Sequence, residues 1–209
     1  MPLIHPRSHP FHEAERHLRQ ADVRLAELMD RHGETCALAV PPPSPFHALV
    51  RTVIDQQLHV KAARRIAERL LAFQGRDRFE ALPLLDIDDR CWREAGLSGS
   101  KIRCIRGLAR AVLDGALDFE TLRAQTDADA LRALTAHAGV GPWTAEIFLM
   151  FALNRADILP LGDLALRNAI RRLYGLEETA PSCRGGNLAS VPLHRQLVSV
   201  DGSGLTPLP

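Results

Sequence analysis

The sequence lacks the features that mark membrane-spanning and secreted proteins. No run of apolar residues approaches the roughly 20 that are needed to cross a bilayer. The start of the chain is rich in His and Pro and contains no apolar core of a secretion signal. We therefore expect a soluble, cytoplasmic protein that is not secreted.

Cysteine is scarce, and its spacing carries no metal motif. The four cysteines, Cys36, Cys91, Cys104 and Cys183, are widely scattered and include no Cys-x-x-Cys pair and no metal-finger spacing. This pattern disfavours an iron–sulfur cluster and fits reduced thiols in the cytosol.

An excess of charge of one sign is missing as well. The 26 Lys and Arg residues are balanced by 25 Asp and Glu residues, which leaves a formal net charge of +1. Composition therefore gives no general argument for a polyanionic partner, and any such partner has to be inferred from local features.

Strand-like sequence patterns are scarce, whereas helical periodicity continues through nearly the whole chain. The sequence therefore predicts an all-α fold. Its 209 residues, of which 46% are hydrophobic and 24% charged, suit one globular domain or two small lobes that share a core.

Turn signals divide the helical pattern into segments. A first helix is predicted over residues 11–31, and a proline-rich run over 41–45 precedes the next. Apolar stripes over 46–54 and 63–71 indicate two helices joined by the polar turn 56–59. Further helices are predicted over residues 102–113 with Ser100 as the cap, 127–137, 142–153 and 164–174.

Three regions are expected along the chain. Residues 1–44 form an N-terminal helix and Pro-rich linker that pack on the core, and residues 45–176 form the core. Residues 177–209 form an atypical tail. Helical periodicity is lost after Tyr174, where no Trp, Tyr or Phe follows and glycines and prolines gather. We expect this tail to be loop or disordered chain.

The most informative stretch is a Gly-x-Gly turn between two helical segments. Gly139, Val140 and Gly141 are followed by Pro142, at the first turn of the next helix. Two glycines allow another chain to approach closely, and the amides of a helix start suit a phosphate. Such a hairpin can hold a DNA backbone without reading its sequence. The same residues also fit an αα-corner with a glycine C-cap.

A carboxylate follows the hairpin. Asp163 lies directly before Leu164 and the apolar stripe of the next predicted helix, where an N-cap is expected. Taken alone, the residue fits a simple helix cap, and capping is compatible with catalysis.

Two more segments lie upstream. Residues 46–63 contain the pair Gln56-Gln57, and residues 96–101 read Gly-Leu-Ser-Gly-Ser-Lys. Together with the hairpin and Asp163, they resemble, in the right order, the motifs of the helix-hairpin-helix (HhH-GPD) DNA glycosylase superfamily. The resemblance is nearest to the bacterial 3-methyladenine DNA glycosylase II (AlkA-like) branch, in a compact form that lacks an N-terminal β domain.

The resemblance implies a two-lobed helical fold with the active-site cleft between the lobes. It implies a base-excision-repair enzyme that hydrolyses the N-glycosidic bond of alkylated purines, 3-methyladenine and related bases, in duplex DNA. Bifunctional members carry, just before the Thr of Gly-x-Gly-x-Lys-Thr, a Lys that attacks the sugar and leads to strand cleavage. This chain has Trp143 there. A monofunctional enzyme without lyase activity, which leaves an abasic site, is therefore implied.

The resemblance also assigns roles to individual residues. Asp163 is the catalytic carboxylate, which stabilises positive charge on the sugar of a flipped nucleotide. The base pocket contains Trp143, Phe46 and Gln56, although Trp143 fits a core residue that fixes the hairpin equally well.

Contacts with DNA are expected at Gln57, Leu58, Lys101, Gly139, Val140, Gly141 and Thr144. Gln57 and Leu58 form the candidate wedge that fills the gap left by the flipped base, with a buried polar cap between helices as the alternative. The main chain near Gly139, Val140 and Gly141 is expected to hold a structural Na⁺ or K⁺, and no other cofactor is required.

The expected partner is double-stranded DNA that contains alkylated bases, bound by a monomer associated with the nucleoid and not with a membrane. Two other functions stay open: a non-catalytic helix-hairpin-helix DNA-binding protein, and a glycosylase for a different lesion class. Asp163 argues against the first, because a binding module has no need of a carboxylate that repels phosphate.

Overall fold

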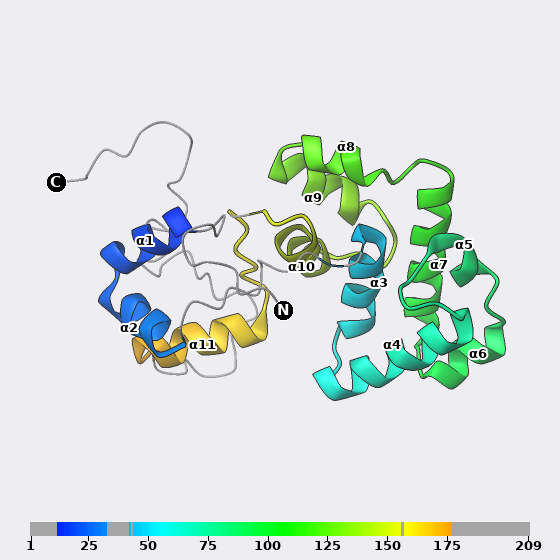
Figure 1. Cartoon of the computed structure of the whole chain (residues 1–209), viewed down its shortest axis with the longest axis horizontal. Coiled ribbons are helices and arrows are strands. Elements are labelled where there is room, and N and C mark those ends of the chain that lie inside the picture. The colour runs from blue at the N-terminus through cyan, green and yellow to red at the C-terminus, as the bar shows by residue number, and fades with distance from the viewer. Residues whose placement is uncertain (1–11, 33–41, 43, 156, 177–209) are drawn as a thin grey trace, which may run out of the picture. The chain divides into compact units, whose positions relative to one another are not determined.

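The computed structural model describes residues 12–32, 42, 44–155 and 157–176. All regular secondary structure in these residues is helical and none is strand (Figure 1), which confirms the all-α fold class. No helix in this part of the chain is both long and apolar enough to span a membrane. The predicted tail, residues 177–209, lies outside the described residues.

The described residues form helices α1 to α11. Their bounds are α1 (His12–Ala21), α2 (Val23–His32), α3 (Pro45–Asp55), α4 (Val60–Gln74), α5 (Ala81–Leu85), α6 (Asp89–Ala95), α7 (Gly99–Leu113), α8 (Phe119–Ala124), α9 (Asp127–Thr135), α10 (Pro142–Ala152) and α11 (Leu164–Tyr174).

Two compact units share these helices. Val40–Pro160, here called the core unit, contains α3 to α10. Met1–Ala39 together with Leu161–Pro209, here called the terminal unit, contains α1, α2 and α11. The predicted region boundaries after residues 44 and 176, and the packing of the N-terminal helix on the core, stay predictions.

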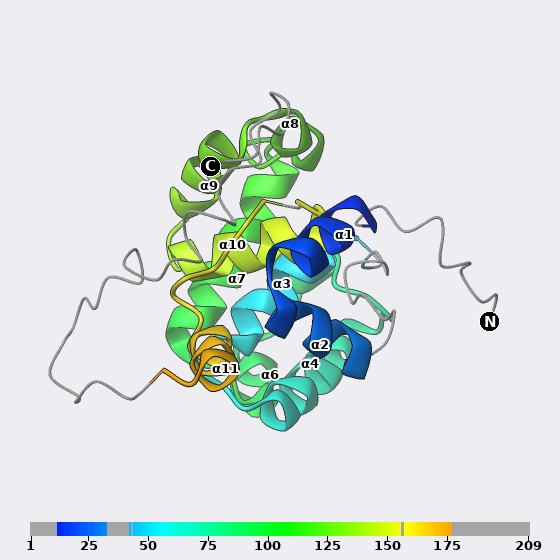
Figure 2. The ribbon, with the colours of Figure 1, turned by 90° about the vertical axis from the view of Figure 1, so that its left-hand side faces the viewer.

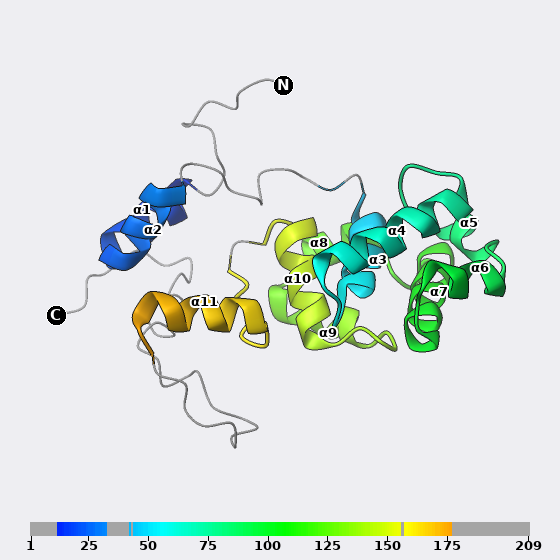
Figure 3. The same cartoon turned by 90° about the horizontal axis from the view of Figure 1, so that it is seen from below.

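Helix α3 is the centre of the core unit. It packs against α10 on one side and against α7 on another (Figure 1), and Leu49, Val50, Val53 and Ile54 are completely buried in these contacts. Helix α9 lies beside α10, with α8 next to α9 (Figure 2). Helix α4 packs on α6, and α5 packs on α7 (Figure 3). The helices on either side of the Gly-x-Gly turn are therefore anchored to the central helix through α10.

In the terminal unit, α11 contacts the junction of α1 and α2 through its last residue. The hydroxyl of Tyr174 donates to Oδ2 of Asp22 at 2.8 Å, and the Arg24 guanidinium lies 5.2 Å from the centroid of the Tyr174 ring. The hydrogen bond from Tyr174 lowers the pKa of Asp22, and burial raises the pKa of Tyr174 to about 12. These contacts fix the C-terminal end of the helix that follows Asp163.

The prediction of one helix over residues 11–31 is wrong, because the chain forms two helices with a break at Asp22. The Asp22 carboxylate accepts hydrogen bonds from the amides of Arg24 at 2.7 Å and Leu25 at 3.2 Å. This is the geometry of an N-cap, so the side chain begins a second helix within a continuous apolar pattern.

The prediction of Ser100 as the cap of α7 is also wrong. Ser98 is the N-cap, and its hydroxyl accepts from the Lys101 amide at 3.4 Å, while the Ser100 hydroxyl pairs with that of Ser98 at 3.0 Å. The sequence pattern also misses α5, α6 and α8, which have 5, 7 and 6 residues. At most two turns of helix are too few for an apolar stripe to repeat.

Candidate functional site

The Gly-x-Gly turn forms a tight hairpin between α9 and α10. The amide of His137 donates to the Leu134 carbonyl at 3.1 Å, and the amide of Val140 donates to the His137 carbonyl at 3.0 Å. Helix α9 ends at a right-handed C-cap, Ala136, three residues before Gly139. The alternative of an αα-corner with a glycine C-cap is therefore wrong.

Gly139 is required by its conformation and by its packing. Its φ of +91° lies in the region that side chains rarely adopt. A Cβ here would lie 2.7 Å from Cβ and 2.8 Å from Sγ of Cys104 in α7. Burial raises the pKa of the Cys104 thiol to about 11, so the thiol stays protonated and acts as a small apolar side chain. The hairpin backbone is thus seated directly on α7.

Gly141 has a different role from Gly139. A Cβ at this position would meet no heavy atom within 4 Å. Gly141 is the N-cap of α10. Because it has no side chain, no side-chain group caps the helix, and Pro142 follows at the start of the helix. The glycine therefore leaves the start of α10 open to close approach, as a phosphate bound to helix amides requires.

Gln56 connects the end of α3 with this hairpin. Its side-chain Nε2 donates to the Gly139 carbonyl oxygen at 3.1 Å and to Oγ1 of Thr144 at 2.7 Å. Thr144 lies in the first turn of α10 and is only 2% exposed, so the bond satisfies a hydroxyl that water does not reach. The structure brings Gln56, Gly139 and Thr144 together at one end of α3.

Lys101 closes the same end of α3. Its ammonium Nζ donates to the carbonyl oxygens of Ile54 at 2.7 Å and Gln56 at 2.6 Å, where the negative end of the helix dipole favours a cation. Burial lowers the pKa of Lys101, and the Asp55 carboxylate opposes that shift. Two of the three ammonium donors are used within the protein, and the expected contact of Lys101 with DNA stays a prediction.

Gln57 and Leu58 form the exposed turn between α3 and α4. Gln57 has a φ of +54°, which reverses the chain sharply, and Leu58 is 39% exposed despite its apolar side chain. This exposure contradicts the alternative of a buried polar cap between helices. The wedge role of Gln57 and Leu58 stays a prediction.

Phe46 lies at the opposite end of α3 from Gln56. It is 7% exposed and packs in the hydrophobic core, next to the start of the helix that Ser44 caps. Ten residues at about 1.5 Å each separate Phe46 from Gln56 by roughly 15 Å along the axis. The structure therefore brings Gln56, and not Phe46, to the hairpin.

Asp163 is the N-cap of α11 in the terminal unit, as the sequence predicts. Its Oδ1 accepts from the Leu166 amide at 2.7 Å, and its backbone is extended. This bond holds the carboxylate in one orientation at the positive end of the helix dipole. The catalytic role of Asp163 stays a prediction.

Comparison with protein families matches residues 50–184 to the HhH-GPD superfamily of base excision DNA repair proteins. The matched range includes the exposed turn, the hairpin and Asp163. The chain belongs to this superfamily.

Several relatives in the superfamily carry the name of one activity. A Schizosaccharomyces pombe protein named DNA-3-methyladenine glycosylase 1 is 32% identical over 169 residues, which cover 78% of this chain and 73% of that protein. A crystal structure named DNA-3-methyladenine glycosidase, from Bacillus halodurans, has a TM-score of 0.68 and 35% identity, and covers 86% of this chain and 80% of its own. The S. pombe 3-methyladenine DNA glycosylase in complex with abasic DNA has a TM-score of 0.78 and 29% identity, and covers 90% of each chain.

In this HhH-GPD protein, Trp143 stands in the first turn of α10, between the open helix start at Gly141 and the buried Thr144. The side chain is half-buried. Both expectations for Trp143, a wall of the base pocket and a residue that fixes the hairpin, stay predictions.

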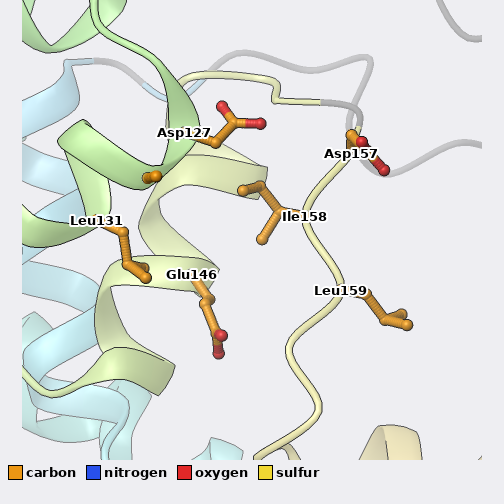
Figure 4. Close-up of a pocket in the computed structure, with 7 residues that line it drawn as sticks. Asp127, Leu131, Glu146, Asp157, Ile158 and Leu159 are labelled. Carbon is orange, nitrogen blue, oxygen red and sulfur yellow. The ribbon is translucent and has the colours of Figure 1, made fainter. Parts of the chain in front are cut away.

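A small cavity that the sequence does not predict lies between α9, α10 and residues 157–159 (Figure 4). It has a volume of about 220 Å³ and is lined by Asp127, Ala128, Leu131, Glu146, Asp157, Ile158 and Leu159. Burial raises the pKa of the Glu146 carboxyl, and Asp127 pairs with Arg155 at 2.5 Å. The acidic lining is unsuited to a phosphate.

Among the described residues, no group of three or more His, Cys, Asp or Glu side chains is arranged to hold a metal ion.

Proposed function

We propose that this HhH-GPD protein is a monofunctional DNA glycosylase that hydrolyses the N-glycosidic bond of alkylated purines, such as 3-methyladenine, in duplex DNA and leaves an abasic site. The observation that carries the proposal is the seated hairpin, whose open helix start suits a DNA phosphate, followed in the same chain by a carboxylate fixed at the N-cap of α11. The names of the relatives support the choice of alkylated bases.

The leaving base needs little assistance in this reaction, whereas the sugar needs a group that stabilises its positive charge. An alkylated purine carries positive charge and departs without prior protonation, while the sugar develops oxocarbenium character. The Asp163 carboxylate, held by the bond from the Leu166 amide, stabilises that charge and orients the attacking water. Each tenfold in rate requires about 1.4 kcal/mol, so one well-placed charge supplies several decades.

The absence of lyase activity follows from residue 143. Strand cleavage by bifunctional relatives requires an amine that forms a Schiff base with the sugar, and the indole of Trp143 cannot do so. The main-chain carbonyls near Gly139, Val140 and Gly141 would hold a structural Na⁺ or K⁺, which would contact a DNA phosphate, and no other cofactor is proposed. The protein acts as a monomer on double-stranded DNA, in association with the nucleoid.

The experiment is incubation with methylated duplex DNA, followed by chromatography of the released bases and by gel analysis of strand breaks before and after alkali. We expect free 3-methyladenine, with breaks only after alkali. No released base would contradict the enzymatic function and leave a DNA-binding protein. Breaks before alkali would contradict the monofunctional chemistry, and release of oxidised or mismatched bases alone would move the enzyme to another lesion class.

A further inference from the structure

Two elements that the proposed function assigns to DNA are joined by one side chain. The hairpin at Gly139–Gly141 and the turn at Gln57–Leu58 belong to different helix pairs, and Gln56 lies between them. Its side chain bonds to the hairpin, and its main chain continues directly into the turn. Gln56 therefore connects the hairpin and the turn directly.

The side-chain bonds require the amide of a glutamine. A primary amide carries two N–H donors on one nitrogen, and here one goes to the Gly139 carbonyl at 3.1 Å and the other to Thr144 Oγ1 at 2.7 Å. The opposite orientation would place the amide oxygen against the Gly139 carbonyl, which has no proton to offer. A glutamate at this position could not donate at all.

The main chain of Gln56 is fixed as firmly as its side chain. Its carbonyl oxygen accepts from Lys101 Nζ at 2.6 Å, and the same ammonium binds the Ile54 carbonyl at 2.7 Å. Gln57, the next residue, adopts the left-handed conformation, and the exposed Leu58 follows it. The origin of the exposed turn is thus held from α7 by Lys101 and from the hairpin by Gln56.

We propose that Gln56 is a positioning residue that fixes the exposed Gln57–Leu58 turn relative to the hairpin, so that gripping the DNA backbone at the hairpin places Leu58 in the base stack. This inference rests on the proposed function and replaces the expected place of Gln56 in the base pocket. It assigns Gln56 to the opening of the duplex rather than to recognition of the base.

The test uses Gln56→Met, which keeps the length and shape of the side chain and removes both donors. The matched control is Gln74→Met, because the Gln74 amide also bonds to the main chain, donating to the Arg78 carbonyl at 2.8 Å and accepting from the Glu80 amide at 3.5 Å, at the far end of α4. Both variants lose two side-chain hydrogen bonds. We expect Gln56→Met to lower Tm more than Gln74→Met, because it also removes the donor to the buried Thr144 hydroxyl.

Two measurements separate positioning from stability. The first is the fluorescence of 2-aminopurine next to a tetrahydrofuran abasic analogue, which rises when a wedge unstacks the probe. The second is single-turnover release of 3-methyladenine. For Gln56→Met we expect less than about half of the wild-type fluorescence rise, and release slowed on the order of 10- to 100-fold, as misplacement by about 1 Å can cause. DNA affinity should change by less than about threefold, the size of a single lost weak contact.

A second variant keeps the test valid if Gln56→Met does not fold. Thr144→Val is nearly isosteric and removes one acceptor of the Gln56 amide, so it should reproduce part of the fluorescence loss. The double variant Gln56→Met/Thr144→Val should be no worse than Gln56→Met alone. Wild-type fluorescence and release in both single variants, or the same losses in Gln74→Met, would overturn the positioning role.

The outcomes also distinguish this inference from the proposed function. If the wild type releases no alkylated base but its fluorescence rise is lost in Gln56→Met, the positioning role holds and the glycosylase proposal fails. If the wild type releases base and gives no fluorescence rise at the abasic analogue, the glycosylase proposal holds and the positioning role fails.

Discussion

At the scale of the residue, one substitution separates the two roles of Asp163, which are the capping of α11 and the proposed part in catalysis. Asn is as good an N-cap as Asp, so Asp163→Asn should keep the bond from the Leu166 amide and the stability of α11 while it removes the charge. We expect the single-turnover rate of 3-methyladenine release to fall on the order of 10²- to 10³-fold, with DNA affinity unchanged or higher.

The control for this substitution is Asp118→Asn at another N-cap. The Asp118 carboxylate caps α8 through the amides of Glu120 and Thr121, so the chemical change and the capping role are matched without a proposed part in catalysis. Full base release by Asp163→Asn would refute the catalytic assignment. An equal loss in both variants would reduce Asp163 to a structural cap.

Replacement of the two hairpin glycines by alanine should affect different properties: stability at Gly139 and DNA affinity at Gly141. Gly139→Ala puts a Cβ against Cys104 at a positive φ, and we expect a loss of about 1–3 kcal/mol in the free energy of unfolding. Gly141→Ala places its Cβ in open space, so stability should fall by under about 1 kcal/mol while the Kd for an abasic-analogue duplex rises.

Urea denaturation and fluorescence anisotropy measure these two quantities, and each variant serves as the control for the other. An unchanged Kd in Gly141→Ala would show that DNA does not approach the start of α10. An unchanged stability in Gly139→Ala would show that the hairpin is not seated on α7.

At the scale of the element, His47 links α3 to the segment before α5. Its Nδ1 accepts from the Phe79 amide at 3.0 Å, and its ring stacks on the Phe79 ring with centroids 5.2 Å apart. Burial, with a smaller effect from Arg51, lowers the pKa of His47 below 6.5. The folded protein therefore holds the neutral imidazole that this contact requires.

The lowered pKa of His47 makes the folded protein lose stability as the pH falls. The unfolded chain binds a proton at His47 as the pH falls below about 6.5, whereas the folded chain resists it, so stability present above that pH is lost as the pH falls through the lowered pKa. Replacement His47→Gln should reduce the drop in unfolding free energy between pH 7 and pH 5, measured by urea denaturation. An undiminished drop in the variant would mean that other groups account for it.

Sequence patterns predict the long helices and miss what depends on single contacts. An apolar stripe of several turns is enough to indicate α10 and α11, and the latter is found at its predicted bounds. Asp22 interrupts a continuous stripe through one carboxylate, and α8 is too short to show a period. Local side-chain bonds, rather than periodicity, determine these features.

The candidate site shows the same limit. The turn, the hairpin and Asp163 could be predicted because each is a contiguous motif whose residue types suit its chemistry. The contact of Gln56 with Gly139 spans 83 positions and depends on how α3 crosses α10. Phe46 and Gln56 share a helix, and only the length of α3 shows that they lie at opposite ends. Such relations arise from packing, which a single sequence does not encode in any local pattern.

At the scale of the whole molecule, the balance of charge bears on how DNA is held. The net charge is only +1, and several arginines of the core unit pair with carboxylates of the same unit. These pairs are Arg64–Glu68, Arg90–Glu94, Arg106–Asp89, Arg132–Asp129 and Arg155–Asp127. We predict that the neutral amides of the hairpin supply most of the phosphate contacts, and that only some of the Lys and Arg side chains outside these pairs reach the DNA.

A shallow salt dependence of DNA binding follows from this arrangement. Each phosphate neutralised by Lys or Arg adds about −0.9 to the slope of log K against log salt concentration, so two to four such contacts give about −2 to −4. Affinity for an abasic-analogue duplex should then fall by only about 60-fold between 50 and 200 mM NaCl, at a slope near −3. The control Arg90→Gln removes a charge already paired with Glu94 on α6 and should leave the slope unchanged. A slope steeper than about −6 would mean that an array of basic side chains, and not the hairpin main chain, carries the binding.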